Sequence, residues 1–282
     1  KFLYGQSLDM KLYYYKDKKG NFGDDLNPWL WGRLLPGMFD DKEDAIFVGI
    51  GTLLNSLLPR EPFKVVFSSG VGYKELPPPV DHTWKIYCVR GPLSAEKLGV
   101  DYTYAITDGA ALLKTIPFDP CEKKYGVSFV PHHLSHRPKW RFVCRNLGIN
   151  YIDPSETVDF VLSEIRSSNL ILAESMHAAI VADVFRVPWI PIKYHSHILD
   201  FKWFDWCQSL GLPYKPIRLP SPIDVECSNA YFVRLKYTLI SLWMKWISMR
   251  VEPNISSENV LHTAVERLQE KLDELKMDYH LY

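Results

Sequence analysis

The sequence has few cysteines and no paired arrangement of them. No two form a CxxC motif, and the five lie far apart, at Cys88, Cys121, Cys144, Cys207 and Cys227. An odd number of scattered cysteines disfavours both a disulfide framework and a structural zinc site. The cysteine pattern therefore favours a reducing compartment, and we expect a cytoplasmic protein.

A long hydrophobic run, a secretory signal and a net charge are also missing. No uninterrupted apolar stretch approaches the roughly 18 residues that a membrane-spanning helix needs. Lys and Arg together number 33, and so do Asp and Glu. This balance gives no global field that would attract nucleic acid. We therefore expect a chain that does not cross the membrane and has no nucleic-acid partner.

No cofactor motif is complete. The turn Gly49–Gly51 lacks the full GxGxxG spacing and the later acidic ribose ligand of a dinucleotide site. The pair Asp24–Asp25 is more typical of carboxylates at a helix N-terminus than of a metal site. The cluster His132, His133 and His136 has neither the HExxH spacing nor an acidic partner within it. We expect neither a cofactor nor a bound metal.

The sequence does contain a regular alternation of strands and helices. With 282 residues, of which 47% are hydrophobic, the chain is long enough for two medium α/β units. A linker-like segment at 117–124 interrupts the alternation, which restarts near residue 125. We predict an α/β fold with a first Rossmann-like domain at 10–118, a second at 125–220 and a helical extension at 229–282.

The individual elements are expected at well-separated positions. Predicted strands span 11–15, 45–49, 64–67, 85–89, 104–106, 126–130, 149–152 and 170–173, with one more ending at Ile192. Predicted helices span 26–35, a short stretch through Leu58, another through Leu98, 141–147, 157–167, a stretch after Ser175 and one ending near Gly211. Gly23 and Gly51 lie in turns after strands, where glycine permits a substrate to approach the backbone closely.

The most informative corner is Glu174–His177, between a short apolar strand and a helix. Ser175 is placed to cap this helix, whose free N–H groups attract anions. A lone helical histidine is more often structural, but the helix dipole favours a neutral His177 ring that can accept a proton. Basic residues stand at four other strand ends: Arg90, His132, Lys193 and His197. Together these positions predict an anion-binding cleft between two domains.

The C-terminal part differs in character. The segment 231–250 contains four basic residues and no acidic one, and its polar residues form one stripe among tryptophans and leucines. That pattern is typical of a helix at an anionic membrane interface, although we favour a helix packed into the protein with this stripe in water. The last predicted helix, 259–277, has an apolar face formed by Leu261, Val265, Leu268, Leu272 and Leu275.

Eight ordered blocks resemble the polysaccharide pyruvyl transferases, particularly the exopolysaccharide ketal-pyruvate branch. The blocks are NFGDDLNPWL, IFVGIGTLLN, SSGVGY, VRGPLSAEKLG, ITDGAALL, VSFVPHH, ESMHAAIVADVFRVPWIPI and FKWFDWCQSLG. The resemblance spans about Met10 to Pro213 and does not cover the C-terminal helices. It implies two Rossmann-like domains that face a central cleft, as in GT-B glycosyltransferases, with phosphoenolpyruvate as the donor and no cofactor. It also implies a pyruvate ketal across two hydroxyls of a sugar, and we expect a lipid-linked polysaccharide repeat unit as the acceptor, at the inner face of a bacterial plasma membrane.

The resemblance implies roles for particular residues. The family pattern has an arginine at the position of Arg90 and a histidine at that of His177. Ketal formation needs a cationic clamp and an acid/base group. We assign the substrate anion to Arg90, whose planar fork suits a carboxylate or phosphate, and general acid/base catalysis to His177. Asp24 or Glu174 is expected to orient or deprotonate an acceptor hydroxyl.

The chain departs from the family pattern at two positions. At the first position other members carry an arginine, and this chain has Ser175. At the second they carry a lysine, and the nearest basic residue of this chain is His197. We expect substitute contacts to the anion from Lys202, Lys193, His132 and Arg137.

Two other functions fit the same pattern. One is a sugar-nucleotide glycosyltransferase of the same fold, in some of which a Glu-x7-Glu spacing like that of Glu156 and Glu164 occurs. The other is a non-catalytic glycan- or anion-binding protein that has kept the cleft.

Overall fold

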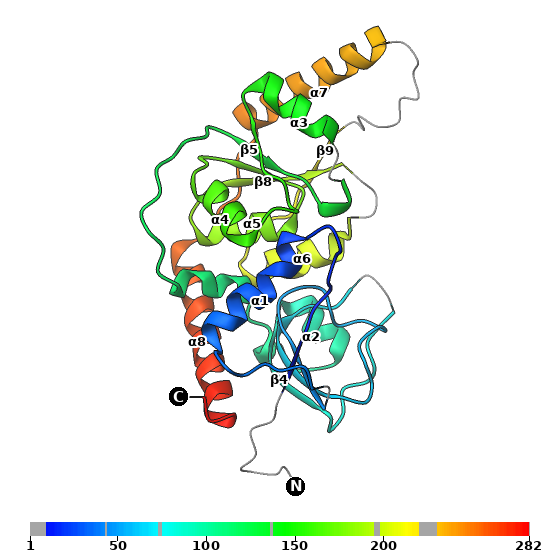
Figure 1. Ribbon diagram of the computed structural model, residues 1–282, viewed down its shortest axis with the longest axis vertical. Helices are drawn as coiled ribbons and strands as arrows, with labels where there is room; N and C mark the ends of the chain where they lie inside the picture. The colour runs from blue at the N-terminus through cyan, green and yellow to red at the C-terminus, as the bar shows by residue number, and fades with distance from the viewer. Residues whose placement is uncertain are drawn as a thin grey trace.

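Two parallel β-sheets with helices on their faces make up the described part of the chain (Figure 1). The computed structural model describes residues 10–42, 44–72, 75–135, 138–194, 198–219 and 230–281, without the side chains of 138–139 and 230–237. The predicted α/β class is confirmed. Among the described residues, no helix combines the length and the apolar character that crossing a membrane requires.

The first sheet has four parallel strands in chain order. They are β1 (Lys11–Tyr13), β2 (Ala45–Val48), β3 (Phe63–Ser69) and β4 (Trp84–Val89). All four residues of β2 are buried, which is typical of a parallel strand covered on both faces. Helix α1 (Phe22–Leu34) covers one face, and α2 (Pro92–Leu98) packs on the other.

The second sheet has the strand order of flavodoxin-type folds. Its strands β5 (Ser128–Val130), β6 (Asn150–Tyr151), β7 (Ile171–Ala173), β8 (Trp189–Lys193) and β9 (Ile217–Arg218) lie in the order β6-β5-β7-β8-β9, and every neighbouring pair is parallel. The chain adds β6 on one side of β5 and then β7, β8 and β9 on the other, so the strand order reverses between β5 and β7. Ligands of such folds bind at this point. The helices are α3 (Pro138–Leu147), α4 (Val158–Arg166), α5 (Met176–Val184) and α6 (Asp200–Ser209).

A hydrophobic core joins the two halves of the chain. Leu30 of α1 and Phe47 of β2 belong to the same buried cluster as Ile171 of β7 and Ala179 of α5. Helix α1 packs against α4 and α5, so elements from both halves meet directly below the carboxyl ends of the strands. This packing holds the two sheets in one arrangement.

The two C-terminal helices attach to different halves. All five residues of the predicted apolar face of α8 (Glu258–Asp278) are buried, which confirms that prediction. This helix returns to the first half, where its Asp278 accepts a 2.5 Å hydrogen bond from Tyr87 and pairs with Lys85 at 3.2 Å. Helix α7 (Ala230–Arg250) instead packs against α3 at the opposite end of the molecule (Figure 1).

Three local predictions are wrong for physical reasons. Residues 52–58 form turns rather than a helix, because the Asn55 side chain hydrogen-bonds to local backbone groups instead. Residues 104–106 form only one bridge, from Ala105 to Val89, because the Asp101 carboxylate starts a 3-10 turn just before them. Helix α1 begins at Phe22, four residues before the predicted start, because the Asp25 carboxylate accepts the backbone N–H of Asn21.

Candidate active site

A cavity of about 490 Å³ lies at the carboxyl ends of strands from both sheets. It is lined by Tyr13, Tyr15, Asn21, Asp24, Gly51, Thr52, Leu53, Asn55, Leu57, His132, His133, Leu134, Ser175, Met176, His177 and Lys202. Six of the twelve positions expected in the site belong to this lining: Asp24, Gly51, His132, Ser175, His177 and Lys202. The expected cleft between two groups of strands is therefore present.

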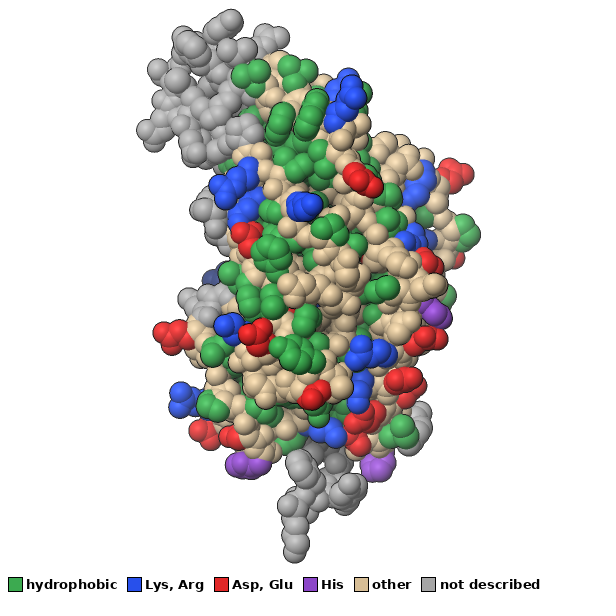
Figure 2. Space-filling view, turned by 180° about the vertical axis from the view of Figure 1, so that it is seen from behind, with side chains coloured by type: hydrophobic (Ala, Val, Ile, Leu, Met, Phe, Trp, Pro, Cys, Tyr) green, Lys and Arg blue, Asp and Glu red, His purple; other side chains and the backbone are tan. Residues whose placement is uncertain are grey.

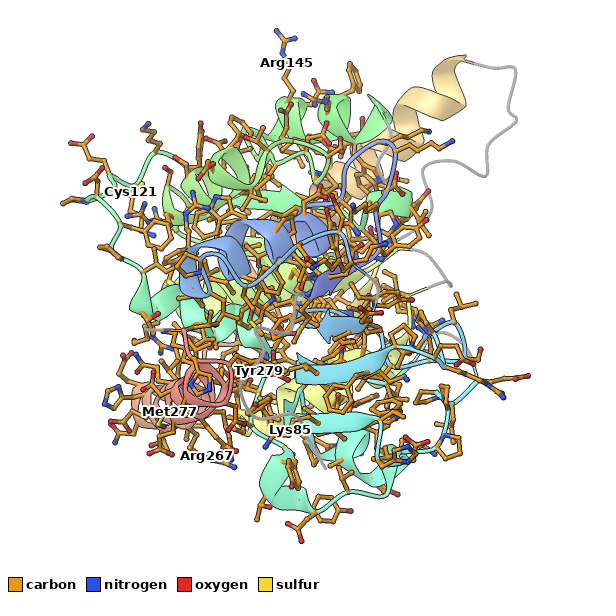
Figure 3. All side chains as sticks on the ribbon, turned by 60° about the horizontal axis from the view of Figure 1, so that its bottom comes forward. Lys85, Cys121, Arg145, Arg267, Met277 and Tyr279 are labelled. Atoms are coloured by element: carbon orange, nitrogen blue, oxygen red, sulfur yellow. The ribbon has the colours of Figure 1, made fainter. Side chains whose placement is uncertain are left out.

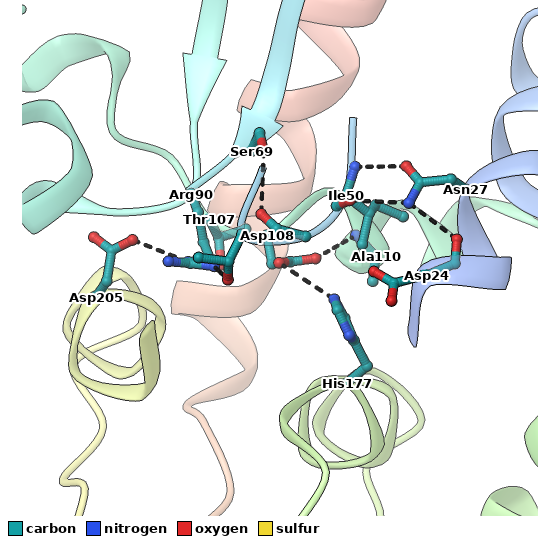
Figure 4. A network of polar contacts seen from close by, with 12 residues as sticks. Asp24, Asn27, Ile50, Ser69, Arg90, Thr107, Asp108, Ala110, His177 and Asp205 are labelled. Atoms are coloured by element: carbon teal, nitrogen blue, oxygen red, sulfur yellow. Dashed lines mark hydrogen bonds and ion pairs between the residues drawn. The ribbon is translucent and has the colours of Figure 1, made fainter. Parts of the chain in front are cut away.

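His177 is the second residue of α5 and points toward the first half of the chain (Figure 4). Only 13% of its side-chain surface is exposed. Burial lowers the pKa of His177 to about 3, and the positive charges of Lys202 and Arg90 lower it further. The ring is therefore neutral at pH 7 in the empty cavity, as its place in the sequence indicates.

The glycine at position 23 makes room for that imidazole. A Cβ atom built on Gly23 would lie 2.2 Å from His177 Nδ1, closer than any side chain can approach. Gly23 does not line the cavity itself, and its contribution is to let α1 pack against the histidine. Gly51, by contrast, lines the cavity and has φ of 119°, a conformation that L side chains rarely adopt.

Asp108 is the acidic partner that faces His177. Its Oδ2 lies 3.9 Å from His177 Nε2, and neither atom has a hydrogen-bond partner among the described residues (Figure 4). Asp108 is fully buried, and burial raises its pKa to about 6. Ser68, with φ of 62° and a buried hydroxyl that also has no partner in the described part of the chain, lies next to Gly109. Orphaned buried polar atoms are rare, and three of them together make this corner a candidate functional site.

Asp24 supplies a carboxyl group directly to the cavity. It lies in the first turn of α1, where the Asn21 side-chain amide donates a hydrogen bond to it. Burial raises the pKa of Asp24 to about 7, although the Asn21 hydrogen bond and the charge of Lys202 act in the opposite direction. A carboxyl group with that pKa exchanges protons near neutral pH.

Lys202 is the cation of the cavity. It projects from the first turn of α6, and only 7% of it is exposed. Burial lowers the pKa of Lys202 to about 7, and Arg90 adds to the effect, whereas Asp24 and Glu174 oppose it. Of the four substitute contacts expected from the sequence, Lys202 and His132 line the cavity in the described part of the chain.

Arg90 lies beneath the cavity and is tied into the protein. Its Nε donates a 2.9 Å hydrogen bond to Asp205 of α6, and its Nη1 donates one of 2.9 Å to the hydroxyl of Thr52. Asp205 also accepts two hydrogen bonds from Ser94, at 2.9 Å and 2.6 Å. Gly70 allows this packing, because a Cβ there would lie 2.1 Å from Arg90 Cζ. Arg90 thus reaches the cavity through Thr52 and through its charge.

Glu174 lies outside the cavity lining and is fully buried. Its two carboxylate oxygens accept the backbone N–H groups of His132 and Tyr194, each at 3.0 Å. The carboxylate therefore joins the chain segments that follow β5 and β8. This geometry suits a positioning role, in which Glu174 fixes the backbone around the cavity.

The histidine pair that follows β5 forms part of the cavity wall. The rings of His132 and His133 lie 4.3 Å apart, and both residues line the cavity. The Nδ1 atom of His132 accepts the backbone N–H of Leu134 at 3.3 Å. Burial lowers the pKa of His133. Ser175 occupies the N-cap position of α5 as predicted, but its side chain makes no capping hydrogen bond and faces the cavity instead.

The remaining predicted cations do not reach the cavity or cannot be placed. Lys193 donates hydrogen bonds of 2.7 Å and 2.6 Å to the carboxylate of Asp200, which holds it away from the lining. Arg137 and His197 lie outside the described residues.

Within the described residues, no group of three or more His, Cys, Asp or Glu side chains is arranged to hold a metal ion. In each of the two clusters considered from the sequence, one described member is engaged by the backbone: Asp25 accepts the N–H of Asn21, and His132 accepts that of Leu134. His136 of the second cluster lies outside the described residues.

Sequence reasoning passed over two important residues. Asp205 is 115 positions from Arg90, and Asp108 is 69 positions from His177, so no local spacing connects either pair. The signal that was available is compositional, since ITDGAALL and FKWFDWCQSLG each place one acid among apolar residues. A lone acid in an apolar block is expected to have a buried partner.

Comparisons with known proteins agree on one family. Residues 2–196 match the family described as polysaccharide pyruvyl transferase. The chain is also 47% identical over 221 residues to the succinoglycan biosynthesis protein ExoV of Rhizobium meliloti (strain 1021). That match covers 77% of this chain and 70% of the relative.

Proposed function

The chain belongs to the polysaccharide pyruvyl transferase family, and we propose that it moves the pyruvyl group of phosphoenolpyruvate onto a sugar of a lipid-linked polysaccharide repeat unit. The product is a pyruvate ketal, and phosphate is released. The observation that carries this proposal is the cavity that brings Asp24, His177 and Lys202 together at the carboxyl ends of the strands.

We propose a GT-B-like arrangement for this enzyme, with Rossmann-like domains at 10–118 and 125–220. The support is that two parallel sheets contribute their carboxyl ends to one cavity, and that the second sheet has a doubly wound strand order. The helical extension at 229–282 then ends with α8 crossing back onto the first domain.

The proposed reaction conserves atoms and charge with the two substrates alone. A proton adds to the methylene carbon of phosphoenolpyruvate, which becomes a methyl group, and positive charge develops at C2. One sugar hydroxyl forms a bond to C2, the bond from C2 to the phosphate oxygen breaks, and a second hydroxyl completes the ketal. Of the two hydroxyl protons, one replaces the proton used at the methylene carbon and the other leaves with phosphate. No metal or cofactor takes part in this scheme.

The donor anion is proposed to bind beside Lys202 and the N-terminus of α5. Ser175 and Met176 line the cavity there, where free backbone N–H groups and the helix dipole favour negative charge. Arg90 contributes its charge from beneath, and its hydrogen bond orients the Thr52 hydroxyl at the cavity wall. Because Ser175 replaces an arginine of the family pattern, Lys202 is assigned the cationic contact.

His177 is proposed to receive its proton when the donor binds. In the empty cavity its pKa is about 3 and that of Lys202 is about 7. A bound anion stabilises the charged forms of both and raises both pKa values. Asp108, 3.9 Å from Nε2, then stabilises the imidazolium, which can protonate the methylene carbon. Asp24 is assigned the complementary task of accepting a hydroxyl proton from the sugar.

The acceptor sugar is proposed to bind against the aromatic wall. Tyr13 and Tyr15 line the cavity together with Leu57, and Tyr15 is 58% exposed. An aromatic ring with a polar tip suits the mixed apolar and hydroxyl surface of a sugar. His132 and His133 line the same cavity and add two further rings to it.

Incubation of the protein with phosphoenolpyruvate and a lipid-linked repeat unit tests the proposal. We expect equal amounts of phosphate and of glycan carrying the added mass of a pyruvyl ketal. Transfer of a sugar from a nucleotide sugar, with phosphoenolpyruvate inert, would overturn the donor assignment in favour of a glycosyltransferase. Binding of both compounds without turnover would leave a non-catalytic protein.

A further inference from the structure

Helix α7 is apolar on two faces, although one of them is already packed. Ile240, Met244 and Ile247 are fully buried against α3 and the second sheet. The outward-facing residues Leu239, Leu242, Trp243, Trp246 and Met249, here called the α7 stripe, are between 40% and 67% exposed. They recur at intervals of three or four positions and so lie along one side of the helix.

The α7 stripe is a continuous apolar surface rather than scattered residues. The rings of Trp243 and Trp246 stack at 4.9 Å with an angle of 4° between their planes. Phe142 of the neighbouring α3 is also exposed, to 54%. Figure 2 shows hydrophobic side chains gathered at the end of the molecule where α7 lies, with basic side chains beside them. A patch of this kind marks an interaction site.

The charged residues of the two helices at this end are of one sign. Helices α3 and α7 contain no acidic residue and seven basic ones: Lys139, Arg141, Arg145, Arg234, Lys236, Lys245 and Arg250. The whole chain is neutral, so positive charge is concentrated at this end. Arg145 projects outward from α3, away from the body of the molecule (Figure 3). Among the described neighbours, Asp153 pairs with Arg141, and Glu252 follows α7.

We propose that the α3–α7 end of the molecule docks on an anionic lipid surface. The α7 stripe enters the boundary between headgroups and acyl chains, and Arg145 and Lys245 face the lipid phosphates. Tryptophan is suited to that boundary because its ring is apolar and its N–H is polar. A helix that combines an apolar face with basic residues lies in the plane of the membrane surface rather than across it.

A second copy of the chain is the competing occupant. A two-fold interface would place the same patch against itself, so the basic residues of two α3–α7 pairs would face one another. Like charges in close apposition destabilise such a contact, whereas anionic lipid neutralises them. The charge pattern therefore favours lipid.

Cosedimentation of the whole protein with vesicles tests this inference. We expect binding to phosphatidylcholine vesicles that contain phosphatidylglycerol, weaker binding to phosphatidylcholine alone, and a decrease at high ionic strength. The double variant Leu242→Glu/Trp246→Glu is expected to weaken binding at least tenfold. Replacing Arg145 and Lys245 by glutamine is expected to cost on the order of fivefold each.

The matched control is Phe160→Glu, which changes an aromatic residue that is 45% exposed on α4, away from the α7 stripe. It should bind vesicles like the wild type. Equal loss in this variant, or no binding of the wild type at low ionic strength, overturns the inference. So does a dimer that Leu242→Glu/Trp246→Glu converts to a monomer without any vesicle binding.

Vesicle binding requires neither donor nor acceptor, so the inference does not rest on the proposed transfer. Vesicle binding by a protein that transfers no pyruvyl group would overturn the proposed function alone. Full activity on a water-soluble acceptor without vesicle binding would overturn the lipid-docking surface alone.

Discussion

The two sides of the cavity carry opposite chemistry. The first half of the chain supplies the acids Asp24 and Asp108, and the second half supplies the bases His177 and Lys202. Burial raises the pKa of the acids to about 7 and about 6, and lowers that of the bases to about 3 and about 7. Because desolvation penalises charge of either sign, both sides approach neutrality in the empty cavity. The bound substrate, rather than the fold alone, then sets the charge of the site.

The largest effect is expected when the base His177 is removed from the second half. Under the proposed mechanism, His177→Ala is expected to lower kcat by about 10²–10⁴, the usual contribution of a general acid/base. Phosphate release at saturating donor and acceptor measures it. The control His262→Ala removes a histidine with 63% of its side chain exposed on α8 and should leave kcat unchanged. Near-normal turnover of His177→Ala would exclude the histidine from the chemistry.

A subtler change moves the base without removing it. In Gly23→Ala the added Cβ would lie 2.2 Å from His177 Nδ1 and must displace the ring. Displacement of a catalytic group by about 1 Å can cost about 10²-fold, so we expect a loss of that size in kcat. Circular dichroism and urea denaturation should show that the fold persists.

Gly32→Ala is the matched control for this change. Gly32 lies on the same helix and has nothing within 4 Å of an added Cβ. Alanine is favoured over glycine inside a helix by about 0.5–1 kcal/mol, so this variant should be slightly more stable and fully active. Equal activity of the two variants would mean that the position of His177 is not critical.

Two lysines of the second half allow a role in the cavity to be separated from a structural role. Lys202 lines the cavity, whereas Lys193 is held by Asp200. Lys202→Met is expected to raise KM for phosphoenolpyruvate by roughly 10- to 100-fold, since a hydrogen bond to a charged group is worth about 1.5–3 kcal/mol. Lys193→Met should change KM by less than about twofold, because a partly exposed ion pair contributes little. The assignment of Lys202 fails if the two variants have the same KM.

The sequence predicted the secondary structure around the site better than the ion pairs between its distant residues. The corner Glu174–His177 and the buried face of α8 follow from local patterns of polarity and spacing, and the structure has both. The corner is local because a buried strand and a helix N-terminus both leave signals within a few residues. Such signals survive in a single sequence.

Pairings across the fold left no comparable signal. Lys193 at a strand end looked like an anion ligand, but packing of α6 brings Asp200 within 2.6 Å of it. Arg90, the residue assigned to the substrate anion, is likewise paired with an acid of α6: its Nε lies 2.9 Å from Asp205 Oδ2, and neither side chain is exposed. Which charges are neutralised depends on how helices pack across the two halves, and no pattern along one segment encodes that packing.

The smallest expected effect is the contribution of Asp24 to the pH dependence of stability, which can be measured without a substrate. Asp24 has a pKa of about 7 in the folded protein and an ordinary value of 3.8 when unfolded. Between these values the folded state binds more protons than the unfolded state, so the free energy of unfolding contributed by Asp24 decreases as pH rises. Asp24→Asn removes this contribution and should be more stable than the wild type above pH 7, by at least about 1 kcal/mol. Below pH 4 the difference should vanish.

Urea denaturation across this range measures the difference in stability, with the exposed Asp41→Asn as control. A wild type whose stability falls between pH 4 and pH 7 by an amount that Asp24→Asn does not alter would place the titrating acid of this cavity elsewhere, with Asp108 the next to test.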